Sequence, residues 1–202
     1  CYLQSIINSI PKKYIQIDML NSTIESLDLP VPNKINEKII NYLGTQIGWR
    51  FAPSEKPFEL RPAFIEVIPP GNVADSGMSI ITYSRNSAKD ATIDYFLNSM
   101  GDWIFYLCQE RSSFKLQYLE RIYWNLYGPT ARPGWHVDSR AAGEYASILY
   151  NLHTNDGGTE FESGKVISKE GRAVIFPSDL KHRGLAPRKY KWRLSLNLVV
   201  KI

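Results

Sequence analysis

Two histidines and one aspartate, far apart along the chain, restrict the folds that this sequence can adopt. His136 and Asp138 are two residues apart, and His182 lies in a distant segment. Residues two apart on a β-strand point to the same face of the sheet, so His136 and Asp138 can approach one metal ion together. A histidine from another strand would complete three ligands and leave about three positions of an octahedral ion open. The spacing therefore favours a β-rich fold that brings distant strands together.

Four short segments after residue 144 are predicted to be strands of such a fold. They are rich in branched and aromatic residues, and they are Tyr145–Leu152, Thr159–Phe161, Arg172–Phe176 and Arg193–Val200. Asn155-Asp156-Gly157-Gly158 is a hairpin signal that predicts a hairpin between the first two. In the last segment, leucines at 194, 196 and 198 alternate with Arg193, Ser195 and Asn197. Short antiparallel strands at this spacing are typical of a jelly roll.

The first 115 residues are predicted to support this core. Asn36–Ile47, with Asn33 as a candidate N-cap, and Ala91–Cys108 place apolar residues at helical spacing. We expect both helices to pack on the outside of a sheet. Phe64–Ile68 and Met78–Tyr83 are predicted strands. Residues 1–202, with 44% hydrophobic residues, fit one mostly β domain, with residues 1–115 as a helical and strand support and residues 116–202 as the core.

Two polar loops in this support region are candidates for a lid over a substrate. They are the loop from Ser84 to Asp90 and the loop from Gly71 to Gly77. Exposed loops of this kind carry binding functions more often than the elements that they connect.

Five motifs follow one another in the last part of the chain: Trp135-His136-Val137-Asp138, SILYNL (147–152), Gly157-Gly158-Thr159-Glu160-Phe161, VIFPSDLKH (174–182) and WRLSLNL (192–198). In this order they resemble the Fe(II)- and 2-oxoglutarate-dependent dioxygenases, in particular the prolyl 4-hydroxylase-like branch. The resemblance covers roughly residues 120–202 and implies a double-stranded β-helix core. It also implies that His136, Asp138 and His182 are the catalytic iron ligands, and that 2-oxoglutarate and O2 are co-substrates.

The same resemblance implies a binding site for 2-oxoglutarate. Arg193 stands where the family places the basic residue that binds the distal carboxylate, and a guanidinium fits a carboxylate bidentately. Lys191 is the alternative. Tyr127 resembles a family tyrosine that helps to bind the co-substrate. Asn151 stands where relatives often have a tyrosine, which puts its role in doubt, although an amide can still donate a hydrogen bond.

One strand face is expected to line the pocket, and three further residues are candidate substrate contacts. Ser147 and Leu149 share the strand parity of Asn151, so we expect all three to face the co-substrate. Trp135, Arg140 and Trp124 are the candidates for substrate contact. For Trp124 and Tyr127 the plainer reading is a core aromatic residue, and for Trp135 and Arg140 it is simple packing or solvation.

Composition limits the partners and the location that we expect. The longest apolar run, Trp103–Cys108, is far too short to span a bilayer, and the N-terminal segment does not resemble a secretory signal. The two cysteines, Cys1 and Cys108, are predicted to be free thiols, which fits a cytoplasmic protein. The chain opens with Cys1 rather than methionine, which leaves its true N-terminus open. The oligomeric state is also open.

The charge of the chain bears on its substrate. Its net charge is +4, and basic residues gather beside the expected pocket at Lys181, Arg183, Arg188, Lys189, Lys191 and Arg193. This cluster can attract 2-oxoglutarate or an acidic substrate. A nucleic-acid partner is not expected, because no long basic stripe interleaved with aromatic residues is present.

The resulting hypothesis is a hydroxylase that acts on an unactivated C–H bond and releases succinate and CO2. The substrate is open between a prolyl or peptidyl group and a small molecule such as an amino acid. An AlkB-like nucleic-acid demethylase is one alternative, although that family adds a second arginine six residues after the first and this chain has Val199 there. A non-catalytic jelly-roll binding protein and a zinc hydrolase are two others.

Overall fold

The computed structural model describes residues 17–21, 24–46, 50–51, 78–85 and 94–202. Its elements, in chain order, are β1 (Ile17–Asn21), β2 (Ile24–Asp28), α2 (Asn33–Thr45), β3 (Arg50–Phe51), β4 (Met78–Ser84), α3 (Tyr95–Gln109), β5 (Tyr118–Tyr127), β6 (Tyr145–Asn151), β7 (Gly158–Phe161), β8 (Gly164–Ile167), β9 (Arg172–Pro177), β10 (His182–Leu185) and β11 (Arg193–Lys201). The strands form a large sheet in the order β1-β2-β9-β6-β11-β5-β4-β3 and a small sheet in the order β10-β7-β8. All pairings between these strands are antiparallel. The mostly β fold with a jelly-roll core is therefore confirmed.

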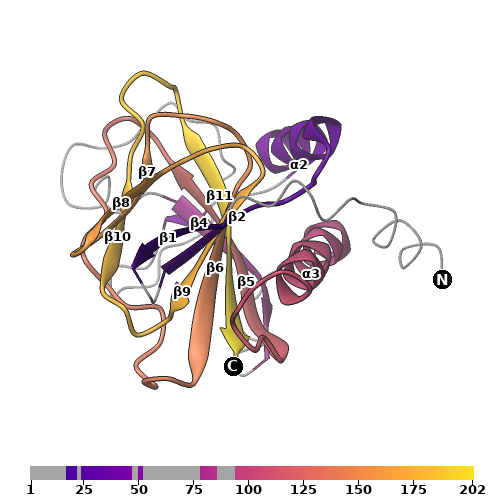
Figure 1. Ribbon diagram of the computed structural model, residues 1–202. Coiled ribbons are helices and arrows are strands. Elements are labelled where there is room, and N and C mark those ends of the chain that lie inside the picture. Colours follow the sequence, from indigo (N-terminus) through magenta and orange to yellow (C-terminus); the bar gives the residue numbers. More distant parts are fainter. Residues whose placement is uncertain (1–16, 22–23, 47–49, 52–77, 86–93) are drawn as a thin grey trace.

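Both helices cover one face of the large sheet, and the small sheet lies on the other side (Figure 1). The helix-covered face carries the even-numbered residues of β6 and β11, such as Ile148 and Leu196, which form one buried cluster with Leu43 of α2 and Leu107 of α3. This arrangement confirms that the helices pack outside the sheet. Burial of this apolar face is the main force that holds the helices in place.

The two helices begin differently from the prediction. The second starts at Tyr95, because Asp94 caps it by accepting a hydrogen bond from the Leu97 backbone N–H at 2.8 Å. In the first, Asn33 is the first helical residue, and the N-cap position is held by Pro32, without a side-chain cap. The prediction of Asn33 as the cap was therefore wrong.

The opposite face of the large sheet points toward the small sheet. A second apolar cluster fills part of this interior, with Leu149, Val174 and Phe176 from the large sheet against Phe161 and Val166 from the small one. The remaining inward positions of β5, β6 and β11 are mostly polar. Period-two alternation thus divides these strands into an apolar face for the helices and a largely polar face for a site.

The predicted hairpin at Asn155-Asp156-Gly157-Gly158 was wrong. β6 pairs with β11 and β9, whereas β7 pairs with β10 and β8, so this turn carries the chain from the large sheet to the small one. The turn residues still act locally, because the Asn155 side chain accepts a hydrogen bond from the Gly157 N–H at 2.9 Å. Gly158 belongs to β7, where a Cβ would lie 2.2 Å from the Val166 carbonyl oxygen.

The N-terminal region does more than cover the core. β2 pairs with β9, and β4, which confirms the predicted strand Met78–Tyr83, pairs with β5. The predicted strand Phe64–Ile68, the loop Gly71–Gly77 and most of the loop Ser84–Asp90 lie outside the described residues. Cys108 is a buried free thiol on α3, and Cys1 is also outside the described part. Neither described helix is long and apolar enough to cross a membrane.

Candidate metal centre and co-substrate site

His136, Asp138 and His182 meet in the interior between the two sheets. Their candidate ligand atoms all lie within 4.8 Å of one another. His136 Nε2 is 3.9 Å from Asp138 Oδ1, and His182 Nε2 is 3.7 Å from Asp138 Oδ2. Neighbouring ligands of an ion at 2.0–2.2 Å are about 3 Å apart, so small side-chain movements suffice to bind one. Two imidazoles and one carboxylate are the donor set typical of a non-haem Fe(II) site.

Backbone pairing fixes the three ligands relative to one another. His136 and His182 form an isolated antiparallel bridge, in which each backbone N–H donates to the carbonyl of the other at 2.9 Å. The Asp138 N–H donates to the Ser178 carbonyl at 2.8 Å. The loop that carries His136 and Asp138 is thus held against the start of β10, which explains how residues so distant in sequence converge.

The tautomer of both histidines suits a metal ligand. His136 Nδ1 is 3.0 Å from the Gly134 carbonyl oxygen, and His182 Nδ1 is 2.9 Å from the Leu180 carbonyl oxygen. A carbonyl oxygen can only accept, so each Nδ1 carries the proton, and the lone pair of Nε2 is left for an ion. In both cases the acceptor lies two residues before the histidine. These backbone acceptors could not be identified from the sequence.

Asp138 is held as a carboxylate by three side chains. Ser147 Oγ donates to its Oδ2 at 2.6 Å, Tyr123 Oη donates to its Oδ1 at 2.7 Å, and Asn197 Nδ2 donates to its Oδ2 at 3.2 Å. Burial raises the pKa of Asp138, but the attraction of His182 in its protonated form and the hydrogen bonds from Ser147 and Tyr123 outweigh it and leave the pKa below its usual value. The pKa of Tyr123 is raised well above its usual value by burial and by Asp138, so the phenol keeps the proton that it donates.

The two histidines differ in their surroundings. The His182 side chain is 3% exposed and packs against Phe176, with ring centroids 4.7 Å apart. Burial lowers the pKa of His182 despite the nearby Asp138, which favours the neutral form that binds metals. The His136 side chain is 45% exposed. One side of the centre is therefore closed by aromatic residues, and the other is accessible.

Arg193 is the most unusual residue of the interior. It is 1% exposed, and its guanidinium donates to Ser168 Oγ at 3.0 Å and to Thr159 Oγ1 at 3.4 Å. Burial lowers its pKa to about 10, so it is still charged at neutral pH. Within the described part of the chain, no carboxylate forms an ion pair with it. A buried cation without a counter-charge is costly, and an anionic ligand would relieve that cost.

The two other basic or aromatic candidates for co-substrate binding, Tyr127 and Lys191, occupy very different positions. The Tyr127 ring lies beside the Arg193 guanidinium, with Cζ 5.5 Å from the ring centroid. Tyr127 and Arg193 are also direct partners in the β5–β11 pairing. Lys191 is exposed and precedes β11. The structure thus brings Tyr127 to Arg193 and leaves Lys191 at the surface.

The predicted pocket-facing residues of β6 all point into the interior, but they have different surroundings. Ser147 contacts Asp138, whereas Leu149 packs in the apolar cluster between the sheets. Asn151 is buried and its Nδ2 donates to the Arg172 carbonyl at 3.1 Å, which uses one of the two N–H donors of the amide. Its Oδ1 and the hydroxyl of neighbouring Ser195 are buried without a partner among the described residues. Such polar atoms, left over at the Arg193 end of the interior, suit a polar ligand or bound water.

The candidate substrate residues are distributed over very different positions. Trp124 is fully buried in the cluster under the helices, on the face of β5 that points away from the metal ligands. It is a core residue, and its expected substrate contact is not possible there. Trp135 is 38% exposed, with the Arg183 guanidinium carbon 4.8 Å from its ring centroid. Arg140 is exposed at the surface.

Sequence reasoning missed Tyr123 and Asn197 as ligand supports. Both have the strand parity of recognised site residues, because Tyr123 lies four residues before Tyr127 on β5 and Asn197 four residues after Arg193 on β11. Parity was therefore a usable signal. It was insufficient by itself, because contact with Asp138 depends on where the metal-bearing loop crosses the sheet.

Fold and site together define a jelly-roll protein with a centre of two histidines and one carboxylate. Solved structures with this fold include a prolyl-4-hydroxylase from Pseudomonas putida, with 14% identity, a TM-score of 0.56 and 100% of both chains covered. The carbocyclase SnoK and the epimerase SnoN of nogalamycin biosynthesis are also similar. SnoK, described as non-heme and alpha-ketoglutarate-dependent, has 7% identity, a TM-score of 0.58 and coverage of 96% of this chain and 85% of its own. SnoN, solved with Fe3+, alpha-ketoglutarate and nogalamycin RO, has 11% identity, a TM-score of 0.55 and coverage of 89% of this chain and 78% of its own.

These similarities concern the fold. No protein-family model matches the sequence, and no curated protein sequence matches it. The chain therefore has the fold of the 2-oxoglutarate- and Fe(II)-dependent oxygenases, at a sequence identity too low to transfer a reaction or a substrate.

Proposed function

We propose that this protein is an Fe(II)- and 2-oxoglutarate-dependent dioxygenase that hydroxylates an unactivated C–H bond of a peptidyl or small, amino-acid-like substrate. The observation that carries the proposal is the buried cation Arg193 on the same inner sheet face as the residues that support Asp138. A metal centre alone fits many activities. A metal centre with a buried cation that lacks a carboxylate partner in the described structure fits an anionic co-substrate.

The spacing of the two features suits 2-oxoglutarate. Arg193 lies four residues before Asn197 on β11, which is about 13 Å along a strand. A guanidinium reaching from Arg193 and a five-carbon dicarboxylate can fill this length together. The Ser195 hydroxyl, which has no hydrogen-bond partner in the described part of the chain, lies between them on the same face and can donate to the bound anion.

Each residue has a definite task in this proposal. The Nε2 atoms of His136 and His182 and the carboxylate of Asp138 would hold Fe(II), which with 2-oxoglutarate and O2 supplies the oxidation of the C–H bond and leaves succinate and CO2 as products. Tyr123 keeps the carboxylate oriented and unprotonated. Arg193 fixes the co-substrate in one register through its distal carboxylate. Phe176 and its aromatic neighbours restrict water on the His182 side.

The alternatives lack comparable support. An AlkB-like demethylase would need a second arginine at Val199, which instead lines a pocket beside the metal centre. A non-catalytic binding protein needs no metal triad with both Nε2 atoms directed to a carboxylate. A zinc hydrolase requires no anionic co-substrate, so this activity does not account for the buried cation Arg193.

Succinate release from 2-oxoglutarate, measured with Fe(II) and O2, tests the proposal directly. We expect wild type to form succinate and His136→Ala to form none, because two ligands do not hold the ion. Arg193→Met should raise the 2-oxoglutarate requirement by about 10- to 100-fold, and Arg193→Lys by less, since it keeps the charge but loses the bidentate fork. Lys191→Met is the matched control and should behave as wild type.

Two results would contradict the proposal. The first is a wild-type protein that binds Fe(II) but converts no 2-oxoglutarate. The second is an Arg193→Met variant that folds, as shown by its thermal unfolding, and keeps wild-type 2-oxoglutarate affinity. If Lys191→Met instead lost affinity, the co-substrate role would pass to Lys191.

A further inference from the structure

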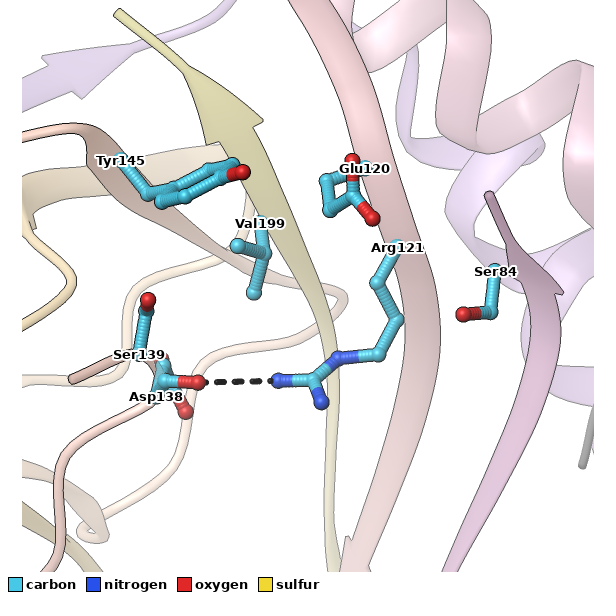
Figure 2. Close-up of a pocket in the computed structure, with 7 residues that line it drawn as sticks. All are labelled: Ser84, Glu120, Arg121, Asp138, Ser139, Tyr145 and Val199. Carbon is cyan, nitrogen blue, oxygen red and sulfur yellow. Dashed lines mark hydrogen bonds between the residues drawn. The ribbon is translucent and has the colours of Figure 1, made fainter. Parts of the chain in front are cut away.

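A pocket lies beside Asp138 and Arg121 (Figure 2). Along the β5–β11 pairing it lies at the end remote from Arg193. Its volume is about 310 Å³. It is lined by Ser84, Glu120, Arg121, Asp138, Ser139, Tyr145 and Val199. This size is at the lower end of the range for small-molecule sites, which is about 300–1,000 Å³. Because Asp138, one of the three candidate metal ligands, forms part of its wall, a molecule bound there lies on the Asp138 side of the candidate metal centre.

Two irregularities in the strands shape this pocket. The β5–β11 pairing shifts register between Val199 and Val200, so that Glu120 is an extra residue on β5. The β4–β5 pairing shifts between Ile81 and Tyr83, two residues before the lining residue Ser84. Extra residues of this kind redirect side chains and are frequent beside active sites. At this end of the sheet they place Glu120 and Arg121, which are consecutive, on the same pocket.

Arg121 is the cation of the pocket. Figure 2 shows its side chain extending from β5 toward the loop that carries Asp138 and Ser139. Its Nη2 donates to the Asp138 backbone carbonyl at 3.3 Å, and its guanidinium carbon is 4.9 Å from the centroid of the Tyr123 ring. Among the residues that the structure describes, one long hydrogen bond and one ring contact orient the guanidinium and leave most of its five N–H donors for a ligand.

Arg121 is too far from Arg193 to bind the same small anion. Arg193 pairs with Tyr127 and Val199 pairs with Arg121, so the two cations are separated by six residues along the ladder, about 20 Å. Tyr123 and Asn197, which both donate hydrogen bonds to Asp138, pair with each other between the two cations. The inner face therefore has a cation at each end and the metal ligands in the middle. One co-substrate of five carbons can occupy only one of the two sides.

We propose that this pocket binds the substrate that the enzyme hydroxylates and that Arg121 pairs with a carboxylate of this substrate. The substrate is then a small carboxylic acid of amino-acid size. The assignment rests on the proposed function, in which Arg193 binds 2-oxoglutarate. A carboxylate fits better than a phosphate, because Glu120 and Asp138 also line the pocket and repel a dianion more strongly than a monoanion. The guanidinium plane matches a carboxylate bidentately.

Equilibrium binding by saturation-transfer NMR tests the assignment without requiring turnover. The probes are the free L-amino acids, each paired with its carboxamide, and inorganic phosphate. The protein is used with saturating 2-oxoglutarate, in a buffer without Mn(II), because this paramagnetic ion would broaden the NMR signals. The variants are Arg121→Met, Arg121→Lys and, as the matched control, Arg85→Met, which removes an exposed cation stacked on Tyr118 outside the pocket.

We expect a subset of the amino acids to bind wild type and Arg85→Met equally and to bind Arg121→Met about tenfold more weakly or worse, as the loss of a charge-assisted pair requires. Arg121→Lys should bind with intermediate affinity. Carboxamides should bind wild type as weakly as the acids bind Arg121→Met. Equal binding of acids and amides, no loss in Arg121→Met, displacement by inorganic phosphate in preference to the acids, or no binding of any acid would each overturn the assignment.

The succinate assay keeps this test separate from the proposed function. A protein that converts 2-oxoglutarate but treats each acid and amide alike is a dioxygenase whose substrate is recognised in another way. A protein that binds the acids through Arg121 but forms no succinate refutes the reaction and leaves the pocket assignment intact.

Discussion

The hydroxyl of Tyr123 is predicted to determine much of the metal affinity, although it is not itself a ligand. It donates to Asp138 Oδ1 at 2.7 Å and is in turn contacted by the Asn197 amide. Tyr123→Phe removes this hydroxyl and keeps the ring, so it leaves no cavity. The loss of a hydrogen bond to a charged group costs about 1.5–3 kcal/mol.

A separate consideration gives a similar magnitude for the same substitution. Removal of a side chain that orients a metal ligand typically lowers metal affinity by about 10- to 100-fold, which corresponds to about 1.4–2.7 kcal/mol. Ser147 and Asn197 still hold Oδ2 in the variant, so the carboxylate stays in place but is free to turn about Oδ2. We therefore expect a loss in affinity of about 10- to 100-fold, well short of abolition.

Titration of the protein with Co(II), followed by its absorbance, measures this affinity without oxidation of the metal. Tyr150→Phe is the matched control, because the Tyr150 hydroxyl is also buried and donates to Asn36 Oδ1 at 2.8 Å, on the helix-covered face of the sheet. It should lower the free energy of unfolding and leave Co(II) affinity unchanged. Wild-type affinity in Tyr123→Phe, or an equal loss in both variants, would refute the reasoning.

Two further predictions concern the Arg193 end of the interior. In Gly184→Ala the new Cβ would lie 2.8 Å from Cε2 of Tyr127, so the ring has to move and the 2-oxoglutarate requirement should rise; Gly128→Ala, where nothing lies within 4 Å of the Cβ, is the control, and equal requirements in both would be contrary evidence. His153 accepts a hydrogen bond from the Leu194 N–H at 3.2 Å, and its pKa is lowered chiefly by burial. The unfolded chain then binds a proton more readily than the folded one, so the free energy of unfolding should fall as the pH drops through the usual pKa of 6.5. In His153→Gln, the difference between the urea-unfolding midpoints at about pH 7.5 and about pH 5 should be smaller than in wild type. An unchanged slope in that variant would exclude His153 as a source.

Local chemistry made the ligands and several strands predictable. The spacing of His136 and Asp138 identified two candidate ligands, although both residues lie in a loop with an isolated bridge at His136 rather than on a strand. The strands β6, β9 and β11 end within one residue of the expected segments. Each of these features is encoded in a stretch of a few residues. The turn Asn155–Gly158 shows the limit of such signals, because its residues specify a turn without specifying which strands pair on either side.

Long-range register accounts for what the sequence could not supply. Alternation alone places Arg121, Tyr123 and Tyr127 on one face of β5, with no indication of which is near the metal and which is at either end. The pairing with β11 decides this, because it sets Tyr127 opposite Arg193 and Tyr123 opposite Asn197. A slip of one residue would turn these side chains toward the helices. In the two proposals above, the same pairing therefore determines which cation would bind the co-substrate and which would bind the acid in the pocket.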